Sequence, residues 1–416
     1  TYSIVFSQVE YKYDANDSSL PYWVQEMYSK NPDPGKVELL YENYYKKNEF
    51  VKNKHTQYYK RWVRNLSRIS QPIAKKPTSK SSNQWECVGP WDFDKDAASS
   101  SYAPGAAHVY TVEQSISNPN VLYAGSATAG AWKTIDKGAN WELLTKDIHL
   151  GGVYAIEIDF ADEDIAYISG NGGVYKTIDG GINWNIIGDT SFTNYTHSVK
   201  DIKLKPNNNL ELFVASNEGL FKSTDGGIYF NQIMSGNFME IEFHPNSADT
   251  MYFIKQAGDS TLFYRSDDGG NTLINYTNGW PNPSSGDEQK RTEIAVSPAA
   301  PNKIVALATG SANGGSGLYG IYISYDKGEN WIFQCCGPYP AGVPDTNNIN
   351  MMGWQPDGSY DGGQYYYDLA LAVNPTNADI IHVGGVNHWI SFDDGVTFTC
   401  PAKWSEPHKK GYVHAD

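Results

Sequence analysis

Six aspartates with the same neighbours are the residues of this sequence best suited to chemistry. Each lies two positions after a Ser or Thr and two before a Gly, in the pattern Ser/Thr-x-Asp-x-Gly-x-x-aromatic. A carboxylate can serve as an acid or base in hydrolysis, or as a ligand for calcium. In this pattern it can also accept backbone N–H groups, while the Gly supplies a positive φ. We therefore predict that the six aspartates shape tight turns and carry out no catalysis.

We call this pattern the box. Its aspartates and glycines are Asp136, Asp179, Asp225, Asp268, Asp326 and Asp393, with Gly138, Gly181, Gly227, Gly270, Gly328 and Gly395. The steps between the aspartates are 43, 46, 43, 58 and 67 residues, and the fourth box ends in Leu273 in place of an aromatic. The first three steps match the period of one propeller blade.

The segments that must position the boxes are rich in β-branched and aromatic residues. Examples are Val121–Gly125, Leu212–Ala215 and Ile304–Leu307, and most such runs follow a Pro/Asn turn. One repeat is then four strands, with the box in the last turn, which is the composition of a propeller blade. The sequence predicts an all-β propeller over residues 85–416, with about six blades.

The two ends of the predicted propeller do not complete a ring. A first strand begins near Trp85, and residues 411–416 have the pattern of the opening strand of another blade. Because an open ring leaves sheet edges unpaired, we expect the native chain to continue past Asp416 and to hold seven or more blades.

One long insertion, residues 332–368, separates the fifth box from the sixth. Long loops on a rigid propeller are common places for binding. Its aromatics Trp354, Tyr360, Tyr365 and Tyr366 suit stacking on sugar rings or gripping a peptide, and we predict them as ligand-binding residues. The alternative is that some of them fill the contact between blades.

Cysteine and metal chemistry are poorly supported by the sequence. The four cysteines are Cys87, Cys335, Cys336 and Cys400, and no spacing among them suits zinc. A disulfide from Cys87 or Cys400 to one of the central pair, or a vicinal bond between Cys335 and Cys336, is open. The Asp-rich loops at 267–268 and 393–394 lack the alternating spacing of a calcium loop. We predict no metal and no cofactor.

The box resembles the Asp-box, or BNR repeat, of sialidases, sortilin-type receptors and xyloglucanases. Sialidases need a cluster of arginines for the substrate carboxylate, whereas the predicted propeller holds only Arg265 and Arg291. The sequence motifs of xyloglucanases resemble those of this chain more closely. That resemblance implies an early catalytic acid, but at the corresponding position the sequence has Ala127–Trp132, which contains no acidic residue. Glycosidase activity is therefore the less favoured hypothesis.

The last repeat resembles large exported propeller proteins of the Bacteroidota that are cargo of the type IX secretion system. The resemblance rests on residues 363–375, 383–389 and 413–416 and covers roughly residues 85–416. It implies export across the outer membrane by the type IX translocon and its shuttle proteins. Two short matches to the O-glycosylation pattern of that phylum place expected sugar sites at Thr250 and Ser260.

The N-terminal region has a different composition. Residues 1–7 resemble the tail of a signal peptide, or alternatively an ordinary strand, and residues 8–69 are predicted to be helical, with helices near 21–28 and 34–66. Residues 70–84 form a polar linker. Residues 46–80 hold eleven basic residues against the single acid Glu49, in a chain of net charge −15. The basic helix either docks on the acidic propeller or binds another partner.

The sequence thus favours an exported, secreted or surface-held propeller without enzymatic activity, with a role in surface interaction, adhesion or gliding. The alternatives are a carbohydrate-active enzyme or glycan-binding protein related to xyloglucanases, and a peptide-binding module like sortilin. Nucleic acid is disfavoured because the acidic body would repel phosphate. No run of apolar residues is long enough to span a membrane. The surface ligand, a glycan or a protein, stays open.

Overall fold

The structure is a computed structural model of the 416-residue chain. The residues that it describes are 18–29, 32, 34–48, 50, 53, 55, 56, 59 and 109–403, the last range without 128, 147, 149, 151, 171, 189–191, 193–197, 313, 314, 337–348, 360 and 361. Contacts group the chain into two compact units, Thr1–Asn83 and Gln84–Asp416. The expected strands near Trp85 and at 411–416, the signal-like segment 1–7, the linker 70–84 and Cys87 lie outside the described residues.

The first unit contains two short helices, α1 (Tyr22–Met27) and α2 (Pro34–Tyr45). They enclose an aromatic cluster in which Tyr41 packs edge-on against Trp23 and stacks on Tyr59, with ring centroids 3.8 Å apart in the second pair. The single long helix predicted over 34–66 is wrong, because α2 ends at Tyr45. The side chain of Asn53 accepts the N–H groups of His55 and Thr56, which is how an N-cap starts a separate helical turn.

The second unit is built from six four-stranded antiparallel sheets, each a simple meander in chain order. The first sheet holds β1 (Val109–Gln114), β2 (Leu122–Ser126), β3 (Ala131–Thr134) and β4 (Glu142–Leu143). The second holds β5 (Ile156–Ile158), β6 (Ala166–Gly170), β7 (Gly173–Thr177) and β8 (Asn185–Ile187). The third holds β9 (Val199–Lys205), β10 (Asn208–Ser216), β11 (Gly219–Ser223) and β12 (Asn231–Ser235).

The remaining three sheets repeat the same order. The fourth holds β13 (Asn237–Phe243), β14 (Met251–Ala257), β15 (Ser260–Ser266) and β16 (Ile274–Asn275). The fifth holds β17 (Glu288–Val296), β18 (Ile304–Ala312), β19 (Gly315–Ser324) and β20 (Ile332–Cys335). The sixth holds β21 (Ala370–Val373), β22 (Ile381–Gly384), β23 (His388–Ser391) and β24 (Thr399–Ala402).

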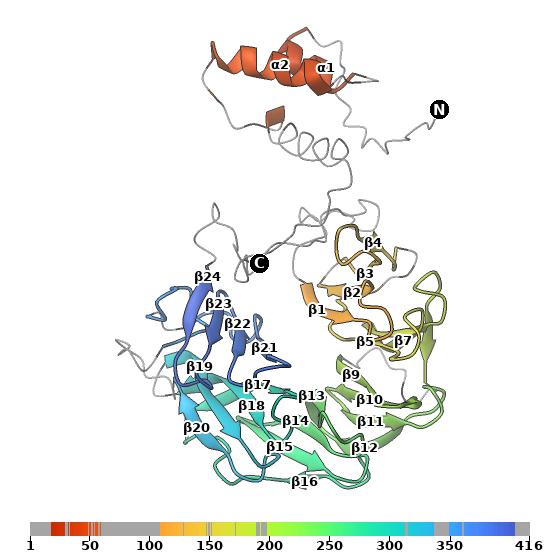
Figure 1. The fold of residues 1–416 in the computed structure, drawn as a ribbon, viewed down its shortest axis with the longest axis vertical. Coiled ribbons are helices and arrows are strands. Elements are labelled where there is room, and N and C mark those ends of the chain that lie inside the picture. The colour runs from red at the N-terminus through yellow and green to blue at the C-terminus, as the bar shows by residue number, and fades with distance from the viewer. Residues whose placement is uncertain are drawn as a thin grey trace. The chain divides into compact units, whose positions relative to one another are not determined.

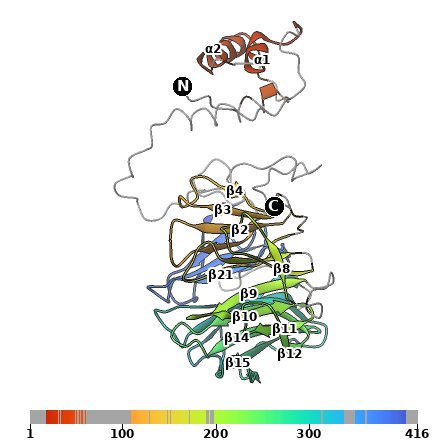
Figure 2. The same cartoon turned by 90° about the vertical axis from the view of Figure 1, so that its right-hand side faces the viewer.

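The sheets follow one another around an axis, with the first strand of each innermost (Figure 1). Figure 2 gives the view from the side. The inner strands contact each other in sequence, from β1 and β5 through to β17 and β21. This arrangement confirms the predicted all-β propeller, with six blades among the described residues. A seventh blade stays a prediction.

The core lies between neighbouring sheets. The clusters alternate side chains from one sheet with side chains from the next, as where Tyr252 and Phe263 of the fourth sheet meet Ile304 and Trp331 of the fifth. The box aromatics lie in or next to these layers, and Phe230, Trp331 and Phe398 are buried. Burial of large aromatic surface on both faces of each sheet is the main stabilising contribution of such a layer.

A basic side chain at the end of the third strand joins each of the first four sheets to the next. It donates to a backbone carbonyl inside the next box; the pairs are Lys133 to Gly180 at 3.2 Å, Lys176 to Gly226 at 3.2 Å, Lys222 to Gly269 at 2.8 Å and Arg265 to Lys327 at 3.2 Å. In the fifth sheet Ile323 takes this position, and Gln334 donates to the carbonyl of Asp394 at 2.8 Å. We call these contacts the forward clamps.

Candidate functional site

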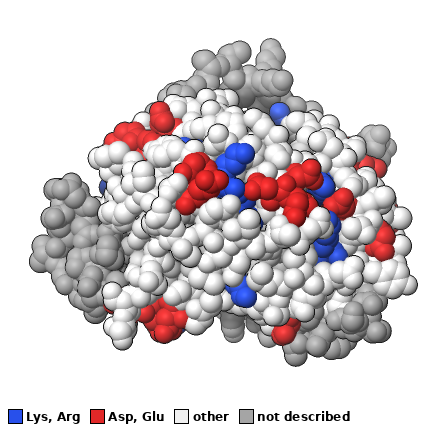
Figure 3. Space-filling model, turned by 90° about the horizontal axis from the view of Figure 1, so that it is seen from below, with Lys and Arg blue, Asp and Glu red and all other residues white. Residues whose placement is uncertain are grey.

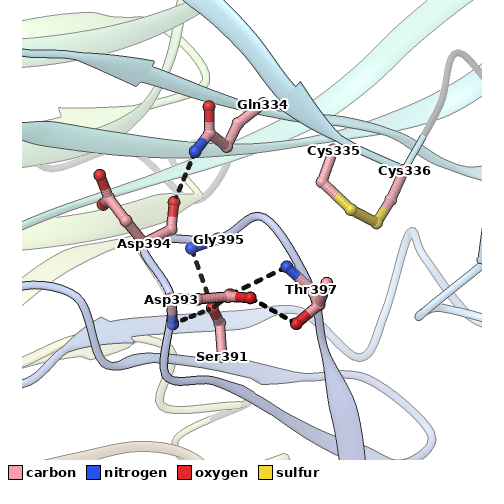
Figure 4. The surroundings of a disulfide bond; sticks show 8 residues. All are labelled: Gln334, Cys335, Cys336, Ser391, Asp393, Asp394, Gly395 and Thr397. Carbon is pink, nitrogen blue, oxygen red and sulfur yellow. Dashed lines mark hydrogen bonds between the residues drawn. A yellow bond between two sulfur atoms is a disulfide. The ribbon is translucent and has the colours of Figure 1, made fainter. Parts of the chain in front are cut away.

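The box is a closed hydrogen-bonded turn, shown for the sixth repeat in Figure 4. The Ser391 hydroxyl donates to Asp393 Oδ1 at 2.8 Å and accepts the N–H of Gly395 at 2.9 Å. The same Oδ1 also accepts the N–H of Thr397 at 2.9 Å, and Oδ2 accepts the Thr397 hydroxyl at 2.6 Å. Both oxygens of this carboxylate are thus bonded inside its own turn.

The other five boxes repeat the Ser/Thr-to-Asp bond at 2.8 Å and the bond from the Gly N–H at 2.8–2.9 Å. The pKa is lowered at all six aspartates. At Asp268 it falls to about 2, chiefly because the backbone N–H and the hydroxyl of Thr272 donate to it. Carboxylates fixed in this way shape their turns, and their lowered pKa keeps them ionised near neutral pH.

The predicted ligand-binding aromatics are not gathered on one surface. Tyr366 is 67% exposed, whereas Tyr365 is half-buried against the core between the fifth and sixth sheets. Trp354 is half-buried, and its carbonyl accepts the side-chain N–H of Asn387 at 3.3 Å. Tyr360 lies outside the described residues. The structure thus leaves Tyr366 as the freely exposed member of the described three.

A cluster that the sequence analysis did not predict lies next to Tyr366. We call it the Tyr110 cluster: Tyr110 on β1, Tyr154 before β5, Lys200 on β9, Arg291 on β17 and Tyr367 before β21. The rings of Tyr110 and Tyr154 stack with centroids 4.6 Å apart, and the Tyr110 hydroxyl donates to that of Tyr367 at 3.4 Å. Five of the six sheets, with their connections, therefore supply one continuous group of side chains.

The cationic members close the cluster on its other side. Arg291 donates to the Tyr367 carbonyl at 3.1 Å and to Glu293 at 2.7 and 2.9 Å. The Lys200 ammonium lies 5.6 Å from the centroid of the Tyr154 ring. Burial and, secondly, the charge of Arg291 lower the pKa of Lys200. Two cations and three tyrosines therefore meet at one end of the inner strands.

Ionisable side chains also recur further along the inner strands. Glu113, Glu157, Lys203 and Glu242 occupy the same position on β1, β5, β9 and β13, each opposite the aromatic of its second strand. A second row holds Asp201, Glu240 and Glu293. We call the acids of both rows the inner carboxylates. They are partly buried and close enough to influence each other's pKa.

The inner carboxylates bond to the next sheet. Glu157, Asp201 and Glu240 accept the backbone N–H groups of Leu204, Ile241 and Ile294, at 2.8, 2.9 and 2.7 Å. An innermost strand presents unpaired N–H groups along its free edge, and these acids satisfy them. Burial, the dominant cause, raises the pKa of Glu157 to about 8 and that of Glu242 to about 7. Their first role is to hold neighbouring sheets together.

The sequence contained a usable pattern for these residues. Each of Glu113, Glu157, Lys203 and Glu242 lies ten residues before an aromatic: Tyr123, Tyr167, Phe213 and Tyr252. A charged residue repeated at one register of an otherwise apolar first strand could have indicated the row. The Tyr110 cluster follows such a pattern only in part. Tyr110, Tyr154 and Lys200 each lie thirteen residues before the same aromatics, Tyr123, Tyr167 and Phe213, whereas Arg291 and Tyr367 lie at other positions of their repeats.

Other predicted sites can also be placed. The Thr250 side chain is only 5% exposed and its hydroxyl donates to Asp267 at 3.2 Å, while Ser260 is half-buried at the start of β15. Cys335 and Cys336 are joined by a vicinal disulfide (Figure 4), and the Cys400 thiol donates to the Ala402 carbonyl at 3.5 Å. Among the described residues, no group of three or more His, Cys, Asp or Glu side chains is arranged to hold a metal. No helix in the described part of the chain is long and apolar enough to cross a membrane.

Comparison with known proteins shows the fold alone. The sequence matches no protein-family model and no curated protein. The structure is similar to a GH74 xyloglucanase from Xanthomonas campestris, with a TM-score of 0.52 and 18% identity over 71% of this chain and 45% of the xyloglucanase. It is also similar to YCF48 bound to D1 peptide, with a TM-score of 0.46 and 17% identity over 71% of this chain and 83% of that one.

The chain therefore spans less than half the length of the xyloglucanase that it resembles. Fold and site together define the class of the protein: a β-propeller whose box aspartates are structural and whose inner strands carry a cationic, tyrosine-rich cluster at one end.

Proposed function

We propose that this protein is an exported β-propeller without enzymatic activity that binds a ligand at a cell surface, in adhesion or gliding. The observation that carries the proposal is the Tyr110 cluster, with exposed Tyr366 beside it in the chain. Aromatic side chains held on rigid elements are typical of binding surfaces. The box aspartates cannot supply an acid/base pair, because their own turns use them.

Loss of the exposed tyrosine tests the binding role. In the source cells, Tyr366→Ala in the full chain should lower the fraction of cells that stay attached to glass under flow toward the level of the gene deletion. The matched control is Tyr229→Ala, which removes a ring of similar exposure, 61%, from a box turn. Attachment unchanged in the deletion strain would overturn the adhesion proposal. If the two variants lowered the attached fraction of cells equally, Tyr366 would have no specific part in adhesion.

Export by the type IX system is part of the same proposal and rests on the sequence resemblance. Its partners would be the translocon and the shuttle proteins of that system. Immunodetection of the full chain in wild-type cells should find it at the surface or in the medium, and cells without the translocon should retain it. A protein found in the cytoplasm of wild-type cells would contradict the localisation.

A carbohydrate-active enzyme is the alternative, and the inner carboxylates are the observation in its favour. Burial raises the pKa of Glu157 to about 8, so its carboxyl can hold a proton at neutral pH, as a general acid must. Release of reducing sugar from xyloglucan or another glucan by the purified full chain, lost in Glu157→Gln, would replace the non-enzymatic proposal with this one.

A further inference from the structure

The Tyr110 cluster contains a preformed aromatic surface. The rings of Tyr110 and Tyr154 are stacked at an interplanar angle of 16°, and Tyr154 is 44% exposed. The Tyr110 ring is fixed from behind, because its hydroxyl bonds to Tyr367 and the two rings meet edge to face at 5.8 Å. A flat ring held in place loses little conformational entropy when a second flat or puckered ring stacks on it.

Lys200 is a cation at the rim of this surface. Among the described residues it forms no ion pair, in contrast to Lys133, Lys205 and Lys303, which pair with carboxylates of the following sheet. Its ammonium lies over the Tyr154 ring, 5.6 Å from the centroid. A partly buried ammonium without a counter-charge gains more from an arriving anion than a solvated one does, because part of its desolvation cost is already met.

Other charged side chains lie near Lys200. Arg291 adds positive potential, although its own donors are occupied by Glu293 and the Tyr367 carbonyl. The neighbouring Asp201 carboxylate is occupied by the N–H groups of Ile202 and Ile241. The charge of Asp368 acts on Tyr110, where it helps burial to raise the pKa of the hydroxyl.

The geometry also separates two kinds of ligand. A peptide that binds by adding a strand needs free backbone N–H groups on a sheet edge. On the inner strands these groups at Leu204, Ile241 and Ile294 are taken by carboxylates of the preceding sheet. Of the two binding modes, stacking of a ligand ring beside one cation is therefore the one that stays open at this site. A sugar ring with a carboxylate on it, a uronic acid, offers both an apolar face and one negative charge.

We propose that Tyr154, stacked on Tyr110, and Lys200 form a subsite for a uronic acid residue of an acidic polysaccharide. This inference rests on the proposed binding function and gives its ligand a chemical class. The Tyr154 ring contacts the apolar face of the sugar, and the Lys200 ammonium pairs with the sugar carboxylate. No bond is made or broken.

The test is titration of the purified full chain with an oligogalacturonate and with its methyl-esterified form, which has the same rings without the charge. The wild type should bind the acid at least tenfold more tightly than the ester. Sodium chloride should weaken the binding of the acid but not the binding of the ester. Lys200→Met should remove this preference. Tyr154→Leu should weaken both ligands. Thermal unfolding of each variant checks that it is folded.

Lys255→Met is the matched control. The Lys255 ammonium also lies 5.6 Å from a ring, that of Phe238, and forms no ion pair in the part of the chain that is described, but it is outside the cluster. This variant should bind like the wild type. Equal affinity for acid and ester, or unchanged binding by Lys200→Met, would overturn the inference.

Further outcomes separate this inference from the function on which it rests. Cell attachment that depends on Tyr366, without binding of the oligogalacturonate, would overturn the uronic acid subsite alone. Binding of an acidic peptide in place of the sugar would do the same. Absence of both attachment and sugar binding would overturn the two proposals together.

Discussion

In four of the six boxes the glycine stands where an added Cβ would come within 2.7 Å of a side chain on the preceding sheet or its connection. At Gly328 φ is +86°, and an added Cβ would lie 2.2 Å from the Phe263 ring. Gly181 and Gly227 approach Leu144 and Ile187 in the same way, at 2.5 Å. The box sequence is thus set by two demands at once, a left-handed backbone and a close approach between sheets.

Replacing one of these glycines should therefore cost more than backbone strain. We expect Gly328→Ala to lower the free energy of unfolding by about 2–5 kcal/mol, from about 1–2 kcal/mol of left-handed strain and about 1–3 kcal/mol of crowding. Gly258→Ala is the control, because φ there is +64° and nothing lies within 4 Å of the added Cβ. It should show the strain alone. Urea unfolding followed by tryptophan fluorescence measures both, and equal losses would contradict this account.

At the scale of elements, each sheet is held to its neighbour by contacts that all run the same way. The forward clamps lead from one sheet to the box of the next, and the inner carboxylates lead to the backbone of the next inner strand. On the face in Figure 3, acidic and basic side chains lie side by side in a band. Short-range pairing between sheets explains how a chain of net charge −15 keeps its sheets together.

The clamp of the third sheet gives a measurable prediction. The Lys222 ammonium donates to the Gly269 carbonyl at 2.8 Å and pairs with Glu211 at 3.1 Å, with its side chain 15% exposed. Lys222→Met should destabilise the fold by about 1–3 kcal/mol, because the buried Gly269 carbonyl loses its donor and Glu211 loses the nearer of its two ammonium partners, Lys205 remaining at 3.6 Å. Lys255→Met, which breaks no ion pair among the described residues, should cost less than half as much. If the two variants unfold at the same urea concentration, the Lys222 clamp does not contribute to the stability of the fold.

The elements also show what could be read from the sequence and what could not. The turns and the strands before them were predictable because residues such as Asp136 and Gly138 act within one repeat. The break after Tyr45 was not, because the 3.6-residue stripe continues through it, while the local cap at Asn53 restarts the helical turn. The Tyr110 cluster as a whole was out of reach for a different reason: alternation along a strand shows that a side chain leaves the core, not which other strands it meets.

At the scale of the whole molecule, two sets of carboxyl groups make the stability of the fold depend on pH in opposite directions. The box aspartates have lowered pKa values, so their stabilising contribution is present above the ordinary value of 3.8 and is lost as the pH falls toward about 2 at Asp268. Among the inner carboxylates Glu157 and Glu242 have raised pKa values, so the folded state holds protons that the unfolded chain has released. Their contribution is present below the ordinary value of 4.5 and is lost as the pH rises through about 7 and 8.

The propeller should therefore be most stable in mildly acidic solution, between about pH 4 and 6. The midpoint of thermal unfolding should rise as the pH is lowered from 9 to about 5 and fall again below about 4. In Glu157→Gln, which keeps the acceptor for Leu204 without the charge, the alkaline decline should be smaller. A flat profile between pH 5 and 9 in the wild type would show that the inner carboxylates are ionised throughout.

The one-way direction of the clamps has a consequence for how such a ring can lengthen. Each of the first five sheets offers a donor on its leading side, a cation in the first four and Gln334 in the fifth, to a carbonyl of the next sheet, so the joint is head-to-tail and not self-complementary. Duplication of a whole repeat keeps a donor and an acceptor at every joint, whereas a break inside a repeat separates the two. Duplication of the gene segment for one repeat therefore lengthens the ring without the loss of a clamp. The steps of 43, 46 and 43 residues between the first four box aspartates fit that origin, whereas the later steps of 58 and 67 residues include added length.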